Sequence, residues 1–496
     1  MIAALAVALL ANAMTKPMGR DEQMYSTAGV LMAQGHLPYR DFSYAAQLPY
    51  HPLLYAAVFR LTGTTWYLLA GRLISVVSDV GVIVLIVAIY RQIVGTGLMG
   101  TGLGLAGAAL YLFNPLVDYA NGYAWNHDVV VLLVLAAMGL YLSPASDHRS
   151  YTWKAAGIGA LLGLASGMRI TTTLTIPLFA AALWLECRSS GMRVRRGMIP
   201  FGAGLMATAI WPVWVIAQAP HAFWLDLVEI PRLYGQWLQE IGMIHDKAAL
   251  TGQCLTTPGY LAILLSLLGL TILAWRSGTK MPSRLRGPLK VTIALGFLFS
   301  WIAFIPPTMW LQYWAIPVPF WVAALAFPLS ALVRSGDTRR LRWACGLMIL
   351  ALLTAMATNP FVISRVPLLF NVQEWEPLRS HRLSQTIVAR TQAPRRVLTL
   401  APLLALEGGG RIYPELSCGA IIYRIGDRLT PTQQRLTRTI GPRSLQDMIA
   451  REPANAVIVG AEEPRWAFLE SPLQAAVGPG WNKQEYPNGL RVYFAP

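Results

Sequence analysis

Long apolar segments recur along most of the chain, and they limit its fold more than any other feature of the sequence. A helix needs roughly 20 apolar residues to cross a hydrocarbon core about 30 Å thick. Only 13% of the residues are charged, whereas a soluble globular protein has about 25%. The pattern predicts a mostly α-helical, polytopic membrane bundle of about eleven spans. The segments that meet or approach the required length are 1–14, 66–90, 97–114, 127–142, 155–168, 171–187, 198–218, 259–275, 290–306, 314–333 and 343–358.

The lysines and arginines between these segments predict the orientation of the bundle, because cytoplasmic loops carry an excess of both. The loops at 15–65 and 219–258 contain few for their length, so we expect these loops, and with them the tail after residue 358, to face outward. A net charge of +16 can indicate nucleic-acid binding. Here the basic residues are concentrated in short loops, so we expect no nucleic-acid partner. The loops predicted to be cytoplasmic contain Arg91, Arg149, Lys154, Arg188, Arg193, Arg195, Arg196, Arg276, Lys280, Arg284, Arg286, Lys290, Arg334, Arg339, Arg340 and Arg342.

The first apolar segment is short for a span. Fourteen helical residues cover only about 21 Å, and no basic residues precede them. The sequence Ala11-Asn12-Ala13 also resembles a signal-peptide cleavage site. We expect the segment to remain as a span, because its loss would break the predicted topology. Cleavage and a start codon further upstream are the alternatives.

The residues after 358 are less apolar and predict a small extracytoplasmic α/β domain at 359–496, attached to a transmembrane module at 1–358. The Gly-rich stretch at 408–410 lacks the strand-to-helix context of a phosphate loop and is expected to be a turn. The domain is predicted to contain strands at 395–400 and 456–459, helices at 431–440 and 444–451, and a hairpin with an Asn-Gly turn at 486–494.

Two outer segments outside the spans have amphipathic patterns. The loop at 219–258 mixes tryptophans and isoleucines with charged residues, which predicts a helix lying at the membrane interface. Residues 22–34 have a similar pattern, and Gly35 is a suitable residue to end that helix.

The four cysteines, Cys187, Cys254, Cys345 and Cys418, show no spacing typical of metal ligands. Cys254 and Cys418 are both predicted to face outward, where they could form a disulfide. We expect two unpaired thiols instead.

Two adjacent carboxylates, Asp21 and Glu22, follow the first apolar segment. A turn with its own carboxylate comes next, at 35–42, with the sequence Gly-His-Leu-Pro-Tyr-Arg-Asp-Phe. A loop that serves only solubility does not require acids beside a membrane, so the sequence predicts a chemical site here. Adjacent residues on a helix point about 100° apart, so only one of the two acids is expected to face a given pocket.

This outer-loop pattern resembles the GT-C glycosyltransferase superfamily over residues 1–335. It is most similar to the bacterial relatives of the dolichyl-phosphate-mannose protein mannosyltransferases and of the aminoarabinose lipid A transferase. Further similarities are Asn126-His127-Asp128 at the start of a span, the small-residue run at 163–169, and the pair Gln312-Tyr313 before two prolines. The chain departs from the family at Arg169, where relatives often have lysine, and at Gln312, where they have histidine.

The resemblance implies a multi-pass glycosyltransferase of the bacterial inner (cytoplasmic) membrane, with its active site on the extracytoplasmic side. Such an enzyme moves a hexosyl or pentosyl sugar from a polyprenyl-phosphate donor to a hydroxyl on a protein, lipid or glycan, in contact with membrane lipids. A single displacement would invert the anomeric centre. No cofactor is expected to be required and no metal ligand is assigned. A divalent metal is compatible with the reaction, although Gln312 weakens any site that uses the family's histidine.

The reaction needs a base for the acceptor proton and positive charge where the phosphate anion develops. The resemblance assigns the base to Asp21, with Glu22 as the second candidate or as the group that orients it. The alternative is that both acids stabilise a helix N-terminus, an effect of about 0.3–1 kcal/mol. Desolvation near the membrane is expected to raise the pKa of Asp21.

Ten further residues are candidates for binding substrate, each with a structural alternative. Arg40, Arg169 and Arg232 are candidates for contacting the donor phosphate. Arg40 and Asp41 can equally brace a turn, Asp128 can cap a helix, and an arginine such as Arg169 can extend to the lipid headgroups. The candidates are Tyr39, Arg40, Asp41, Gln47, His51, Asp128, Arg169, Arg232, Gln312 and Tyr313.

Two other classes of protein fit parts of the sequence. A multi-span transporter or lipid flippase of the cell envelope also has many spans, but it predicts paired broken helices and ionisable residues near mid-membrane. Arg72 and Asp79 lie within a predicted span, and we expect them to be paired inside the bundle rather than to form a relay. A non-catalytic scaffold of envelope assembly would fit a site that lacks the family's histidine.

Overall fold

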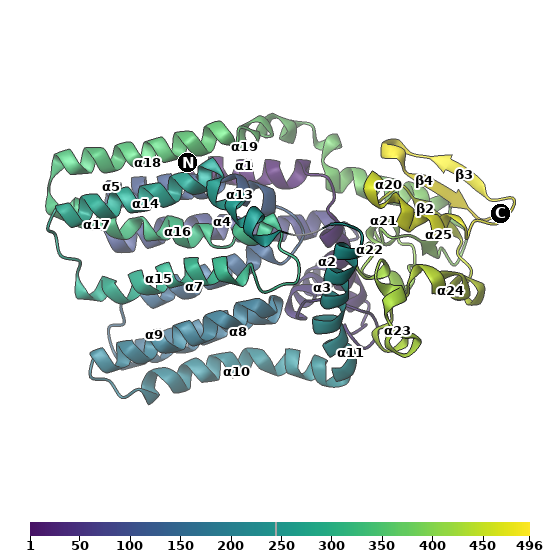
Figure 1. Ribbon diagram of the computed structural model, residues 1–496, viewed down its shortest axis with the longest axis horizontal. Coiled ribbons are helices and arrows are strands. Elements are labelled where there is room, and N and C mark those ends of the chain that lie inside the picture. Colours follow the sequence, from purple (N-terminus) through teal and green to yellow (C-terminus); the bar gives the residue numbers. More distant parts are fainter. Residues whose placement is uncertain (244–245) are drawn as a thin grey trace.

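The computed structural model describes residues 1–243 and 246–496. It consists of a bundle of long helices with an α/β domain at one end, which we call the domain end (Figure 1). Each predicted apolar segment corresponds to a helix or a pair of helices. The helices of the bundle are α1 (Ile2–Thr15), α4 (Tyr67–Val94), α5 (Leu98–Leu112), α7 (His127–Leu142), α8 (His148–Met168), α9 (Thr175–Ser189), α10 (Arg195–Gln218), α14 (Pro258–Arg276), α15 (Ser283–Ile302), α16 (Val318–Ala324), α17 (Ala326–Ser335) and α18 (Thr338–Thr358).

Within the described residues, seven helical segments are long and apolar enough to cross a membrane, or eight if α1 and the following helix form one bent span. The apolar helices α5 and α7 are shorter. The membrane bundle is therefore confirmed, whereas the count of eleven spans stays a prediction.

The apolar surface is distributed as expected for a bundle in lipid. The segment Leu311–Ser335, at the centre, has 94% of its most apolar stretch buried, whereas the corresponding value is 17% for α10 and 22% for α18. Exposing apolar surface to water costs about 25 cal/mol per Å², so helices with so much exposed apolar surface require lipid around them. Trp214 of α10 and Leu350 of α18 are among the exposed side chains.

Short helices lie across the domain end of the bundle (Figure 1). The first of them, α2 (Arg20–Ala33), is bent by 92° from α1. It ends before Gly35, whose φ of +98° is in the left-handed region that glycine tolerates. The amphipathic helix predicted within 219–258 is confirmed by α12. A helix is present at 22–34 as predicted, but it is not amphipathic, because residues 22–32 are buried on all sides. The other short helices are α3 (Tyr50–Thr62), α6 (Pro115–Ala120), α11 (Pro220–Trp224), α12 (Ile230–Glu240) and α13 (Lys247–Thr256).

The C-terminal domain contains a four-stranded sheet in the order β1-β2-β4-β3, with β1 parallel to β2 and the other pairs antiparallel. The strands and the 486–494 hairpin are confirmed, although β1 is shorter than predicted. The predicted turn at 408–410 follows α21. The elements are α19 (Phe361–Ser364), α20 (Glu376–Arg390), β1 (Val397–Leu398), α21 (Leu403–Leu406), α22 (Ala420–Tyr423), α23 (Pro431–Thr437), α24 (Leu445–Arg451), β2 (Ala456–Val459), α25 (Ser471–Gln474), β3 (Asn482–Glu485) and β4 (Arg491–Phe494).

Buried hydrogen bonds hold this domain against the short helices. The Gln23 side chain of α2 accepts a bond of 2.9 Å from the Leu403 amide. The carbonyl of Ser43 accepts one of 3.1 Å from the Cys418 thiol. Cys418 and Cys254 are both free thiols, as predicted. These contacts hold the domain against α2 and the loop that follows it. The two adjacent acids lie in the first turn of α2.

Candidate active site

A cavity of about 530 Å³ lies where the bundle, the short helices and the C-terminal domain meet. The loop before α2, the start of α2, the 45–47 loop, α12 and the segment before α16 form its walls, and the C-terminal domain completes it. The ionisable or amide side chains that line the cavity are Arg20, Asp21, Glu22, Tyr25, Gln47, Tyr119, Tyr123, Asn126, His127, Arg169, Tyr234, Gln312, Tyr313, Arg424, Glu463 and Arg465.

Asp21 lines this cavity as the second residue of α2. Its carboxylate is partly exposed to the cavity, and none of the described residues donates a hydrogen bond to it or pairs with it. Burial raises the pKa of Asp21 above its usual range, and the cations Arg20, Arg424 and Arg169 partly offset that rise. A carboxylate with a raised pKa and no fixed partner is free to accept a proton from a bound substrate.

The neighbouring acid has the opposite environment. Glu22 is completely buried, and it forms a two-bond ion pair with Arg72 of α4, at 2.9 Å and 2.8 Å. Its two oxygens also accept bonds from the backbone amides of Ala124, at 2.6 Å, and Gly19, at 2.7 Å. The carboxylate therefore has a donor on every favourable side. The bond from the Gly19 amide caps the N-terminus of α2, which is the structural alternative given for Glu22.

Arg72 uses all of its donors on the chain around Asp21. Besides Glu22, it donates to the carbonyls of Ala13 and Lys16, both at 2.7 Å, and of Pro17, at 3.1 Å. The guanidinium thus fixes the turn between α1 and α2 from inside the bundle. Arg72 is paired as predicted. Asp79 is not its partner and instead accepts bonds from Tyr111 and Asn121.

Arg169 is the cation that the bundle contributes to the cavity. It follows α8, and its guanidinium lies 4.9 Å from the centre of the Tyr313 ring. Within the described residues, no carboxylate pairs with Arg169. Gln47 and Gln312 line the same cavity, and Gln47 accepts a bond of 2.8 Å from Asn126. Asp21, Arg169, Gln47, Gln312 and Tyr313, predicted from distant parts of the sequence, are therefore together.

The turn at 39–41 does not reach the cavity. The Tyr39 side chain is buried and donates a bond of 2.7 Å to the Gln47 carbonyl, so it supports the loop that carries Gln47. Arg40 is exposed and pairs with Asp41, which also accepts a bond of 2.8 Å from the Leu37 amide. The structural alternative for these residues, a braced turn, describes them.

Three other candidates also lie outside the cavity. His51 is buried between the rings of Tyr25 and Tyr55. Asp128 is buried and accepts a bond of 3.2 Å from the Gly122 amide, because the chain folds back above the start of α7. Arg232 is exposed and pairs with Glu229 on the same helical face.

The sequence analysis named no residue of the C-terminal domain as part of the site. Arg424, Arg465, Glu463 and Trp466 all line the cavity. No motif marks them, because Arg424 follows a short apolar helix and the other three lie at the start of the 3-10 helix Pro464–Glu470. Their only signal was the prediction that the domain lies on the same side as Asp21.

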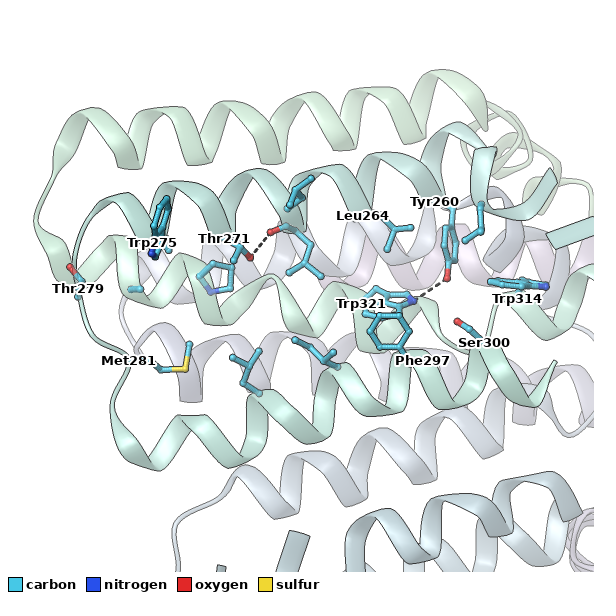
Figure 2. A pocket seen from close by; sticks show the side chains of 18 residues that line it. Tyr260, Leu264, Thr271, Trp275, Thr279, Met281, Phe297, Ser300, Trp314 and Trp321 are labelled. Atoms are coloured by element: carbon cyan, nitrogen blue, oxygen red, sulfur yellow. Dashed lines mark hydrogen bonds between the residues drawn. The ribbon is translucent and has the colours of Figure 1, made fainter. Parts of the chain in front are cut away.

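An apolar groove of about 770 Å³ lies beside this cavity, within the bundle. It is lined by α14, α15 and the segment through α16 and α17. Figure 2 shows Leu264, Trp275 and Phe297 along it, with Trp314 at the domain end. Trp321 donates a bond of 3.0 Å to Tyr260 within its wall, so both polar groups are satisfied. Trp314 and Tyr313 are consecutive, and one lines the groove while the other lines the cavity.

The described residues contain no group of three or more His, Cys, Asp or Glu side chains able to hold a metal ion. Metal dependence is therefore an open prediction, and the roles considered below use only the side chains of the chain itself.

Neither the protein-family models nor the sequences of curated proteins match the chain. Solved structures do. The crystal structure of ArnT from Cupriavidus metallidurans bound to undecaprenyl phosphate is similar, with a TM-score of 0.61 and 13% identity over 99% of this chain and 96% of ArnT. The Archaeoglobus fulgidus oligosaccharyltransferase tethered with an acceptor peptide gives a TM-score of 0.52 and 11% identity, over 99% and 73% of the two chains. The chain therefore has the fold of the GT-C membrane glycosyltransferases.

Proposed function

We propose that the chain is a glycosyltransferase that moves a sugar from a polyprenyl-phosphate donor to an acceptor hydroxyl on the outer face of the membrane. One observation supports this most directly. Asp21 is an unpaired carboxylate in a cavity that also holds Arg169, on the fold of an enzyme crystallised with undecaprenyl phosphate.

In the proposed reaction the acceptor oxygen attacks the anomeric carbon while the bond from that carbon to the donor phosphate breaks. Asp21 takes the proton from the acceptor hydroxyl, and the electron pair of the broken bond leaves with polyprenyl phosphate. Arg169 stabilises the negative charge that develops on the leaving phosphate. A single displacement of this kind inverts the anomeric centre. Glu22 takes no part in proton transfer, because bonds from Arg72 and two backbone amides occupy both of its oxygens.

The apolar groove is suited to the isoprenoid tail of the donor. It lies within the bundle and is lined by apolar side chains. It approaches the cavity at Trp314. A tail in the groove places its phosphate at the Tyr313 and Arg169 wall. A lipid with a charged head requires an apolar site for its tail next to a polar site for its head. Here one short turn separates the groove from the cavity.

The test uses the full chain in lipid nanodiscs, with a panel of radiolabelled polyprenyl-phosphate sugars and membrane extracts as the source of acceptor. We expect release of polyprenyl phosphate and transfer of label with one donor. Asp21→Asn should lower turnover about 10²–10⁴-fold, the usual contribution of a general base, with donor affinity kept. Arg40→Gln, an exposed residue of the same loop region, is the control.

Turnover that survives in folded Asp21→Asn protein would show that Asp21 is not the base. Movement of intact donor across the bilayer without sugar transfer would instead identify a flippase. The protein would be a scaffold if it neither transfers sugar nor moves lipid.

A further inference from the structure

Three arginines surround one tryptophan on the C-terminal-domain side of the cavity. The guanidinium carbons of Arg424, Arg465 and Arg20 lie 4.9 Å, 5.3 Å and 5.5 Å from the ring centre of Trp466. Arg20 belongs to α2 and directly precedes Asp21, whereas the other residues belong to the domain. We call these four residues the roof cluster.

Arg424 is the most deeply buried member of the roof cluster, with 2% of its side chain exposed. Its guanidinium also lies 5.6 Å from the ring of Tyr234 and 5.5 Å from that of Trp237. Nε donates to the Ala420 carbonyl at 2.8 Å, and Nη1 donates to the Tyr234 hydroxyl at 3.1 Å. Nη2 makes no hydrogen bond within the described residues. A buried donor without an acceptor is costly, so the site favours a ligand that supplies one.

The nearby carboxylates do not satisfy this donor. Glu462 is 3.7 Å from Arg424 Nη2, too far for a hydrogen bond, and lies closer to Arg20, at 3.0 Å. Glu463 pairs with Arg465 at 2.7 Å. Glu462, Glu463 and Asp21 thus face the three arginines, and what the cluster offers a ligand is hydrogen-bond donors that lack acceptors. The indole nitrogen of Trp466 is a second buried donor without a partner. Both donors belong to residues that line the cavity.

We propose that the roof cluster is a second anion-binding subsite, separate from Arg169, which binds a phosphate or carboxylate group of the acceptor. This inference rests on the proposed function. The donor phosphate is tied to the bundle through its tail, whereas Arg424 belongs to the domain on the other side of α2 (Figure 1). Both Arg424 and Arg169 act to lower the pKa of Asp21, and all three residues line the same cavity. An acceptor held at the roof cluster therefore brings its hydroxyl to Asp21, the proposed base. The acceptor then carries an anionic group, and the small anionic sugars below serve as probes for it.

The experiment measures dissociation constants by tryptophan fluorescence on the full chain in nanodiscs. The probes are glucose 6-phosphate, glucuronate, glucose and undecaprenyl phosphate. We expect at least one anionic sugar to bind and glucose not to bind. Arg424→Gln should weaken binding of the anionic sugar at least about tenfold, as expected for loss of a charged hydrogen bond, while the affinity for undecaprenyl phosphate stays unchanged. The control is Arg428→Gln, an arginine of the same domain that pairs with Glu240.

Arg424 is buried, so its replacement can unfold the domain. Arg465→Gln is therefore the second variant, because 57% of the Arg465 side chain is exposed. It should weaken binding of the anionic sugar several-fold without changing the melting temperature. Equal binding of glucose and the anionic sugars, or unchanged binding in folded variants, would overturn the proposal. So would an equal loss of undecaprenyl phosphate affinity, because the cluster would then belong to the donor site.

These results separate the inference from the proposed function. Anion binding that depends on Arg424 in a protein without transferase activity would leave the subsite standing and reject the enzyme. Transfer to a neutral acceptor at an unchanged rate in Arg424→Gln would support the proposed function and reject the anion-binding subsite.

Discussion

The polar cavity and the apolar groove are neighbours with opposite chemistry. The cavity is lined by arginines, acids and amides, whereas the groove is lined almost entirely by leucines, aromatic residues and other apolar side chains. The short helical turn Leu311–Trp314 separates them. The comparison indicates that the two linings are built by different elements: the groove by three neighbouring helical segments of the bundle, and the cavity by helix ends and a separate domain. Each can therefore be altered alone.

The largest expected effect concerns the ion pair beneath the cavity. Glu22→Gln leaves the Arg72 guanidinium buried without a counter-charge, which should lower the free energy of unfolding by about 3–5 kcal/mol. Thermal unfolding in detergent measures this change. Replacing both partners, as Glu22→Gln with Arg72→Met, should restore much of the loss. A single variant as stable as the parent would show that the pair does not hold the α1–α2 turn.

The next largest effect concerns the part of the site that is proposed to bind the phosphate head of the donor rather than its tail. Arg169→Gln should weaken undecaprenyl phosphate binding about 10-fold to 100-fold, because a charged hydrogen bond contributes about 1.5–3 kcal/mol. Arg232→Gln, the exposed arginine paired with Glu229, should change it little. Native mass spectrometry of the two variants compares them. Equal losses would mean that the arginines attract lipid only through their overall charge.

The pH dependence of turnover should depend on the ionisable groups of the cavity and not on the apolar groove. Burial raises the pKa of Asp21, so its carboxylate is lost on acidification at a higher pH than for an ordinary aspartate. Turnover should therefore fall about tenfold per pH unit below that raised pKa, because only the ionised form accepts a proton. The residual turnover of Asp21→Asn should lack this acid limb. Should the limb persist in that variant, another group would be responsible for it.

The smallest effect is expected in the groove. Leu264→Trp fills part of it, as the position of Leu264 in Figure 2 indicates, and should weaken binding of undecaprenyl phosphate several-fold. Binding of a short-chain polyprenyl phosphate should change less. Leu265→Trp is the matched control, because Leu265 is on the exposed face of α14. Equal behaviour of the two variants would exclude the groove as the site of the tail.

Much of the fold follows from local patterns in the sequence. Apolar length predicted the helices of the bundle, amphipathic spacing predicted α12, a short apolar run predicted β2, and an Asn-Gly turn predicted the final hairpin. These features depend on residues close together in the chain. The number of spans was less predictable, because short apolar helices such as α5 and α7 do not reveal whether they cross a membrane.

The site was predictable only in part. The resemblance selected Asp21, Arg169, Gln312 and Tyr313, all of which line the cavity. It also selected Arg40 because of its spacing in the loop, which does not reveal the direction of a side chain. The positive φ of Tyr39, +68°, belongs to a turn whose arginine points away. The roof cluster was missed because Arg424, Arg465 and Trp466 lie far along the chain from Arg20 and Asp21 and belong to no motif.

The sequence by itself determined that two acids stand side by side at the start of a helix beside a membrane, and that they point in different directions. Only the tertiary structure decided which of the two acids forms an ion pair. Arg72 comes from α4, and its position under Glu22 depends on how α4 packs against α1. Electrostatic environment is a property of groups brought together in space, so two adjacent carboxylic acids become one buried, paired carboxylate and one without a partner among the described residues.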